Sequence, residues 1–157
     1  VFGGIYMASD SQLNDHHLVV EHIKPRCVSY EYFNGILSDK ARGVFNGRIY
    51  VYPNAIKTDA KQTNKNLLLS DDAVINSKPQ LEIYADDVKC THGATVGRLD
   101  QNAIFYLRSR GININDARRM LIWAFASVIL DHINNQECRE ELEKIVADWL
   151  SSHFANI

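Results

Sequence analysis

The sequence predicts a mainly β chain that ends in a helical region, with stacked coils of strand over residues 1–97 and helices over 98–157. Three observations lead to this fold class. Short apolar and aromatic runs in the first region are separated by Gly, Asn, Asp, Ser and Pro. No amphipathic helix fits between these runs, which excludes a doubly wound α/β sheet. The second region instead repeats its apolar residues with a helical period.

Six runs in the first region are expected to form strands. The segments 48–52 and 80–85 alternate strictly between polar and apolar side chains, as half-buried strands do. The six runs span residues 1–7, 18–23, 27–33, 44–52, 67–69 and 81–84. Their recurrence at roughly 15–20 residues, with Asn and Asp at the intervening corners, favours a parallel solenoid. An antiparallel sandwich with Asn-Gly hairpin tips stays open as the alternative.

Three helices are expected in residues 98–157. The first begins near Asp100 and ends at Gly111, since glycine suits the left-handed backbone that often closes a helix. Asn115 is the expected N-cap of the second helix. The third helix carries Cys138 on an apolar face, which predicts a buried cysteine.

The composition excludes several classes of protein. The chain has 157 residues, of which 46% are hydrophobic and 23% charged, with a net charge of −2. A nearly neutral chain lacks the excess of cations that nucleic-acid binding requires. The longest apolar run, 120–130, is about half the length that a bilayer demands, so no membrane partner is expected. Three widely spaced cysteines form no disulfide framework and indicate a reducing compartment, the cytoplasm.

Cys90 and His92 form the most specific local feature of the sequence. If the strand continues through them, both side chains point to the same face. A thiolate beside an imidazole is a candidate pair of metal ligands, although two ligands do not close a metal site. Any metal here would be held weakly, transiently or together with another chain. A purely structural role for both residues and a nucleophile–base pair are the alternatives.

Two other groups of residues have simpler interpretations. Asp86 and Asp87 could serve a polysaccharide-cleaving enzyme, because such enzymes use paired carboxylates. Adjacent strand residues point to opposite faces, however, so a solvated turn is the favoured interpretation. His16 and His17 are expected in a solvated loop.

The segments 62–73, 78–97 and 105–111 resemble the SufB/SufD family of iron–sulfur cluster assembly scaffold proteins. The Lys-Cys-Thr-His-Gly stretch at 89–93 resembles the SufD branch more than SufB. The resemblance implies a right-handed parallel β-helix followed by a C-terminal helical domain, and so favours the solenoid over the sandwich. Because the chain starts at Val1 without an initiator Met, we expect it to be a fragment of a longer protein, and the resemblance implies that it is the C-terminal part.

The resemblance also implies a function and partners. The resemblance implies that the chain is a non-catalytic scaffold. Such a scaffold pairs with a SufB-like paralogue and binds a SufC-like ABC ATPase through helices near residues 99–119. A transient iron–sulfur cluster would form at the interface with SufB, with His92, and Cys90 beside it, as candidate ligands. No cofactor is expected in the isolated fragment, whose exposed strand edge would favour a homodimer. A carbohydrate-active β-helix enzyme and a plain oligomerising solenoid are the alternative functions.

Overall fold

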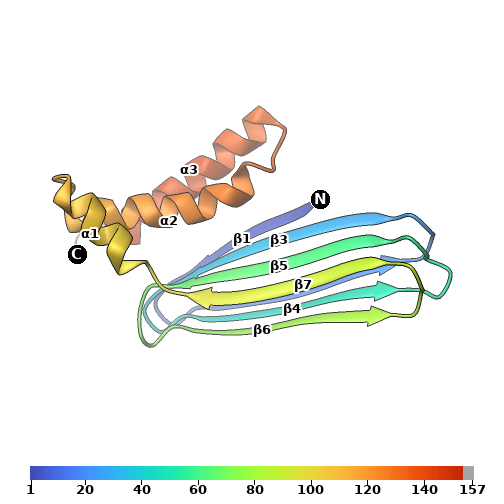
Figure 1. Cartoon of the computed structure of the whole chain (residues 1–157). Coiled ribbons are helices and arrows are strands. Elements are labelled where there is room, and N and C mark those ends of the chain that lie inside the picture. The colour runs from blue at the N-terminus through green and yellow to red at the C-terminus, as the bar shows by residue number, and fades with distance from the viewer. Residues whose placement is uncertain (154–157) are drawn as a thin grey trace. The chain divides into compact units, whose positions relative to one another are not determined.

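The computed structural model describes residues 1–153 and divides the chain into two compact units, Val1–Val96 and Gly97–Ile157. The first unit is a parallel β-solenoid of about three turns, and the second contains three helices (Figure 1). The predicted fold class, mainly β with C-terminal helices, is therefore confirmed.

Each turn of the solenoid contributes one strand to each of two parallel sheets. In the first sheet the order is β1 (Phe2–Ala8), β3 (Val28–Leu37), β5 (Asp59–Leu68) and β7 (Lys89–Gly97), and in the second it is β2 (Leu13–His22), β4 (Arg42–Val51) and β6 (Val74–Ile83). Residues one turn apart lie side by side, so that Gly35 has Tyr6 on one side and Asn66 on the other. Parallel pairing rules out the antiparallel sandwich.

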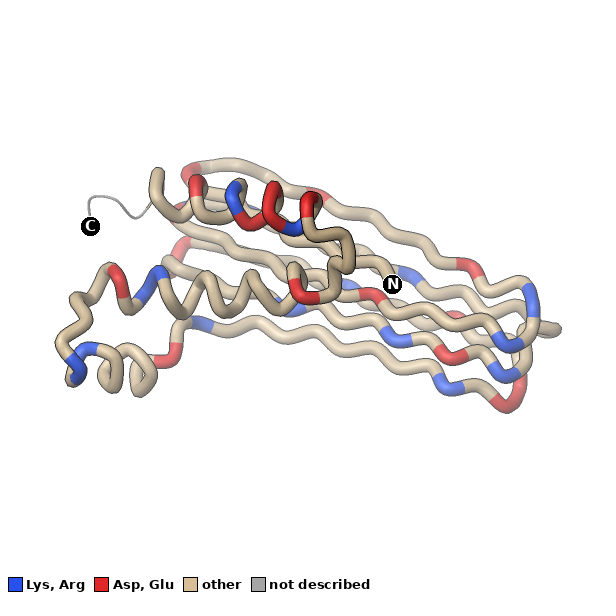
Figure 2. The backbone as a smooth tube through the Cα atoms, turned by 90° about the horizontal axis from the view of Figure 1, so that it is seen from above, with Lys and Arg blue, Asp and Glu red and all other residues tan. Residues whose placement is uncertain are grey.

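Residues with a left-handed backbone form the corners of the solenoid. Asp10 and Asp39 follow strands of the first sheet, and Arg26, Lys57 and Asp87 follow strands of the second, all with φ between 52° and 61°. Backbone bonds join successive corners, as between the Lys57 N–H and the Asp87 carbonyl at 2.9 Å. Asp at corners was expected, because it tolerates this conformation, but Arg and Lys were not. Charged positions gather at the corners after the second sheet (Figure 2).

The interior of the solenoid has an apolar cluster near each row of corners, and several buried polar residues lie between the two clusters. One apolar cluster is formed by Ala8, Leu37, Ala41 and Ala73, and the other by Ile49, Val51, Ala55, Ala60 and Ala85. The buried polar residues between them include Glu31, Gln62, Asn64 and Asn66. This composition hid β5 from the sequence prediction, which found a strand only at 67–69, because inward-facing Gln and Asn read as a loop.

The strand β2 corrects the expectation for His16 and His17, which lie in this strand and not in a loop. His17 faces outward, with its Nε2 3.0 Å from the Asp15 carboxylate. The ring of His16 packs against that of Tyr6 at 4.7 Å between centroids, and its Nε2 is buried.

The second unit contains α1 (Gln101–Ser109), α2 (Ile114–Leu130) and α3 (Gln136–His153). The Asp100 carboxylate caps α1, and Gly111 follows α1 with φ 86°, as expected. The N-cap of α2 is Asn113 and not Asn115, since the Asn113 side chain accepts the first N–H groups of the helix. Cys138 is exposed, contrary to the prediction, because α3 buries only its later residues Val146 and Leu150. No helix among the described residues has the length and apolarity to cross a membrane.

Candidate functional site

The strand β7 is the last of its sheet and lies next to β5 (Figure 1). The Lys89 N–H donates to the Thr58 carbonyl at 2.8 Å. The Asp59 N–H donates to the Cys27 carbonyl in the same way, and Asp59 is aligned with the next residue, Val28. By the same geometry, Lys89 is aligned with Asp59. The register therefore places Cys90 beside Ala60 and His92 beside Gln62.

This register puts Cys90 and His92 on the side of β7 that faces the interior of the coil. Their neighbours Ala60 and Gln62 are buried, whereas Lys61, between them, is exposed. Cys90 itself is half-buried against an apolar interior cluster, and His92 is exposed. The structure thus brings the two candidate ligands to one face, at the end of the solenoid where no further strand covers them among the described residues.

The environment of Cys90 favours a protonated thiol in the metal-free chain. Burial raises the pKa of Cys90, a hydrogen bond with the Ala60 backbone lowers it, and the Asp59 carboxylate raises it. A thiol must lose its proton to bind iron, so occupancy by a metal would release that proton. Within residues 1–153, no three His, Cys, Asp or Glu side chains gather as a metal site.

A hydrogen-bonded row of buried polar side chains crosses the interior of the solenoid and ends at the position beside His92. The His22 Nε2 lies 2.9 Å from the Ser29 Oγ, which donates to Glu31 at 3.4 Å. The Gln62 Nε2 donates to the other Glu31 oxygen at 2.7 Å. The sequence pattern does not show this hydrogen-bonded row, because its members are far apart in the sequence and only the register between turns brings them together.

Glu31 gives the solenoid a characteristic pH dependence. Burial raises its pKa above the ordinary value, against the lowering effect of hydrogen bonds from Gln62 and Ser29. A carboxyl whose pKa is higher in the folded state binds its proton more tightly there, so its contribution to stability falls as the pH rises from about 4.3 through the folded pKa. We expect Glu31→Gln to remove this loss, because the amide keeps an acceptor for Gln62 without a charge.

Urea unfolding of the wild type and of E31Q between pH 4 and pH 8 measures the effect. As the pH rises, the free energy of unfolding of E31Q should increase relative to that of the wild type, and the difference should then level off. Burial lowers the pKa of His22, but His22 titrates in both proteins, so its contribution to the difference in the free energy of unfolding cancels to first order. A difference that stays constant, or that moves toward the wild type, contradicts the assignment.

The carboxylates proposed for a polysaccharide-cleaving enzyme lie in the turn between β6 and β7. Asp86 and Asp87 are both exposed, and Asp87 has the left-handed backbone of a corner. The Asp87 carboxylate lies 3.9 Å from the Lys57 ammonium. This geometry fits the solvated turn that the sequence favours.

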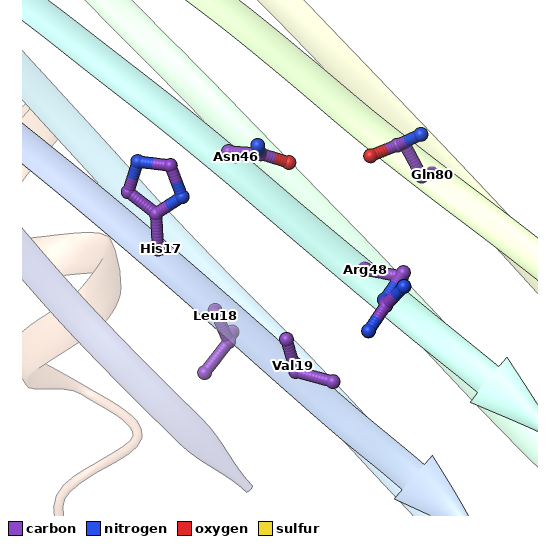
Figure 3. A pocket seen from close by; sticks show the side chains of 6 residues that line it. All are labelled: His17, Leu18, Val19, Asn46, Arg48 and Gln80. Carbon is purple, nitrogen blue, oxygen red and sulfur yellow. The ribbon is translucent and has the colours of Figure 1, made fainter.

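A shallow pocket lies on the outer face of the second sheet (Figure 3). It encloses about 160 Å³ and is lined by His17, Leu18, Val19, Asn46, Arg48 and Gln80. Arg48 also approaches the Glu82 carboxylate at 3.4 Å. The six lining residues offer hydrogen-bond donors and apolar contacts but not the acid pair that glycoside hydrolysis uses.

Comparison with known proteins identifies the family. Residues 1–125 match the family model described as SUF system FeS cluster assembly, SufBD core domain. The chain is 49% identical over 136 residues to the iron-sulfur cluster assembly protein SufD of Escherichia coli, covering 87% of this chain and 32% of that protein. It is 40% identical over 146 residues to a SufBD family protein of Synechocystis, covering 93% and 32%.

A plant relative is more distant. Protein ABCI7, chloroplastic, of Arabidopsis thaliana is 37% identical over 148 residues, covering 92% of this chain and 31% of the plant protein. The chain therefore spans about a third of the length of these three relatives. The matched core takes in the whole solenoid, including β7 with Cys90 and His92. The chain belongs to the SufBD family of iron–sulfur cluster assembly proteins.

Proposed function

We propose that this chain is the cluster-site region of a SufD-like scaffold, and that its β7 forms half of an iron–sulfur assembly site shared with a SufB-like paralogue. One observation carries the proposal: Cys90 and His92 share the interior-facing side of the end strand of the solenoid. Thiolate and imidazole are both known ligands of iron–sulfur clusters. Clusters take four protein ligands, so a thiol and an imidazole need two more, which the paralogue supplies.

The exposed edge of β7 suits this pairing. An end strand offers unpaired N–H and C=O groups, which bind readily to a strand of another chain. A paralogue with the same solenoid would present a matching edge and continue the sheet. The cluster is the product of the assembly and not a resident cofactor, and the chain acts as a non-catalytic scaffold in the cytoplasm.

The helical unit is the proposed binding site for a SufC-like ATPase. It exposes large apolar side chains on α1 and α2, with Phe105 75% and Met120 49% accessible. Between α2 and α3 lies an open apolar pocket of about 370 Å³, lined by Arg119, Met120, Trp123, Ala147, Leu150 and Ser151. Exposed apolar surface next to arginine is typical of protein interfaces.

Anaerobic reconstitution with iron and sulfide tests the proposal. The chain is incubated alone, with its SufB-like paralogue, and with both the paralogue and the ATPase, and visible absorption is read after gel filtration. We expect colour only when the paralogue is present, in a fraction that contains both chains, and co-elution of the ATPase with this chain.

Other outcomes separate the alternatives. Equal colour in the chain alone contradicts a shared site. A colourless homodimer that excludes the paralogue favours the plain oligomerising solenoid, and cleavage of a polysaccharide favours the enzyme.

A further inference from the structure

We infer that Gln62 is a positioning residue for His92, and that its side-chain carbonyl accepts a hydrogen bond from one imidazole N–H so that the other ring nitrogen faces the shared site. This inference rests on the proposed role of His92 as a ligand. It begins from one unusual atom, since Gln62 Oε1 is buried and has no hydrogen-bond partner among the described residues.

The orientation of the Gln62 amide is set by its neighbours. Its Nε2 donates to Glu31 at 2.7 Å, which directs the carbonyl oxygen away from that carboxylate. Ser29 holds the other Glu31 oxygen at 3.4 Å. Gly47 makes room for the amide, because a Cβ there would come within 2.6 Å of the Gln62 Nε2. The Glu31 carboxylate thus fixes the amide on one side and the backbone at Gly47 lies close on the other. The unpaired Gln62 oxygen therefore has a defined position in the interior.

His92 is the side chain that the register places beside this acceptor. It occupies the next turn of the same interior-facing column, where neighbouring strands lie about 4.8 Å apart. The imidazole is exposed, so it is free to turn about its side-chain torsions. Turned inward, it comes within hydrogen-bond reach of the amide, and its N–H satisfies an oxygen that would otherwise stay buried without a partner.

Such a bond has a defined chemical consequence. A histidine that binds a metal usually donates its second N–H to a carbonyl or carboxylate, which fixes the tautomer and the plane of the ring. Gln62 supplies this carbonyl, and the chain from His22 through Ser29 and Glu31 holds it in place. The interior of the solenoid thereby prepares His92 before any partner or iron arrives.

The tautomer of His92 in the metal-free protein is the direct test. Long-range ¹H–¹⁵N correlation spectra in alkaline buffer show which ring nitrogen carries the proton. The His92→Ala variant identifies the signals among the six histidines. We expect one dominant tautomer in the wild type and a mixture of both in Gln62→Met, which keeps the volume of the side chain but removes the acceptor.

The Thr63→Val variant is the matched control, since Thr63 is adjacent to Gln62 on β5 and points to the opposite face of the strand. It should leave the His92 tautomer unchanged. If Gln62→Met does not fold, the wild-type spectrum still decides: a mixture of tautomers, as expected if a water molecule occupies the Gln62 oxygen, overturns the inference.

A second readout separates this inference from the proposed function. In the reconstituted complex, Gln62→Met should speed the loss of iron to a chelator about 10-fold, in the range found when such supporting bonds are removed. If His92→Ala leaves cluster formation intact while the tautomer behaves as expected, the ligand role fails and the positioning bond stands. If the wild type contains both tautomers of His92, the hydrogen bond from His92 to Gln62 is ruled out, whether or not the cluster forms.

Discussion

Gly35→Ala is expected to lower the midpoint of thermal unfolding by roughly 5–15 °C, from a loss of about 2–4 kcal/mol of stability. The reason is a side-chain hydrogen bond that joins two strands that are not neighbours, across the strand between them. The Tyr6 hydroxyl on β1 donates to the Asn66 Oδ1 on β5, and Gly35 on β3 lies between them. A Cβ at Gly35 would overlap both the tyrosine ring and the asparagine oxygen.

Neither neighbour can move away cheaply. Tyr6 is 4% exposed and Asn66 is 3% exposed. Asn64 donates to the Tyr6 hydroxyl at 3.1 Å, and Asn66 donates to Asn64 at 2.7 Å. An added methyl group therefore costs both packing and hydrogen bonds in a region where unsatisfied polar groups are expensive.

Gly93→Ala is the matched control for this prediction. Gly93 lies on β7 in the same sheet, and a Cβ there would meet nothing within 4 Å. Calorimetry or circular dichroism should show the large shift for Gly35→Ala alone. Equal shifts in the two variants, or an unchanged midpoint for Gly35→Ala, would show that the polar column does not hold the coils together.

His92→Ala is expected to remove most of the cluster that forms on the complex with the SufB-like paralogue, while the fold stays intact. The side chain is exposed, and the network of Glu31, Gln62 and the buried asparagines is held by its own hydrogen bonds without His92, so loss of the imidazole costs little stability. Loss of one ligand from a site that needs four leaves iron open to solvent and to chelators. Iron and sulfide analysis after anaerobic reconstitution measures the loss.

Thr91→Ala controls for changes to the strand itself. Thr91 is adjacent, exposed and directed to the opposite face of β7. This variant should retain the cluster content of the wild type and should bind the paralogue equally well. A full cluster content in His92→Ala, with Thr91→Ala unchanged, would remove His92 from the site.

The fold was predictable wherever apolar side chains fill the interior. The predicted run 44–52, in which residues 48–52 alternate strictly, begins within two residues of the start of β4 at Arg42. The sequence pattern shows little of the strands β5 and β6, because the inward-facing residues in the middle of each strand are polar or short. Gln62, Asn64 and Asn66 point inward as valine or isoleucine would, and hydrogen bonds between turns satisfy them. A pattern of hydrophobicity alone cannot show that a buried amide has a partner one turn away.

The candidate site was half predictable for the same reason. Alternation along one strand was enough to place Cys90 and His92 on the same face. The alignment of His92 with Gln62 depends on the lengths of the two connections between β5 and β7, residues 69–73 and 84–88, and the hydrophobic pattern does not fix these lengths. Glu31 and Gln62 were therefore absent from the predicted site.

The most direct measurement is the nitrogen coupling of the assembled cluster. The complex is reconstituted anaerobically, the cluster is reduced to a paramagnetic state, and electron spin echo envelope modulation is recorded with this chain carrying either ¹⁴N- or ¹⁵N-labelled histidine. We expect a directly bound imidazole nitrogen whose modulation changes with the isotope in this chain and disappears in His92→Ala. A cluster with no such coupling, or with the same coupling in His92→Ala, would contradict the claim that this end of the solenoid supplies a ligand.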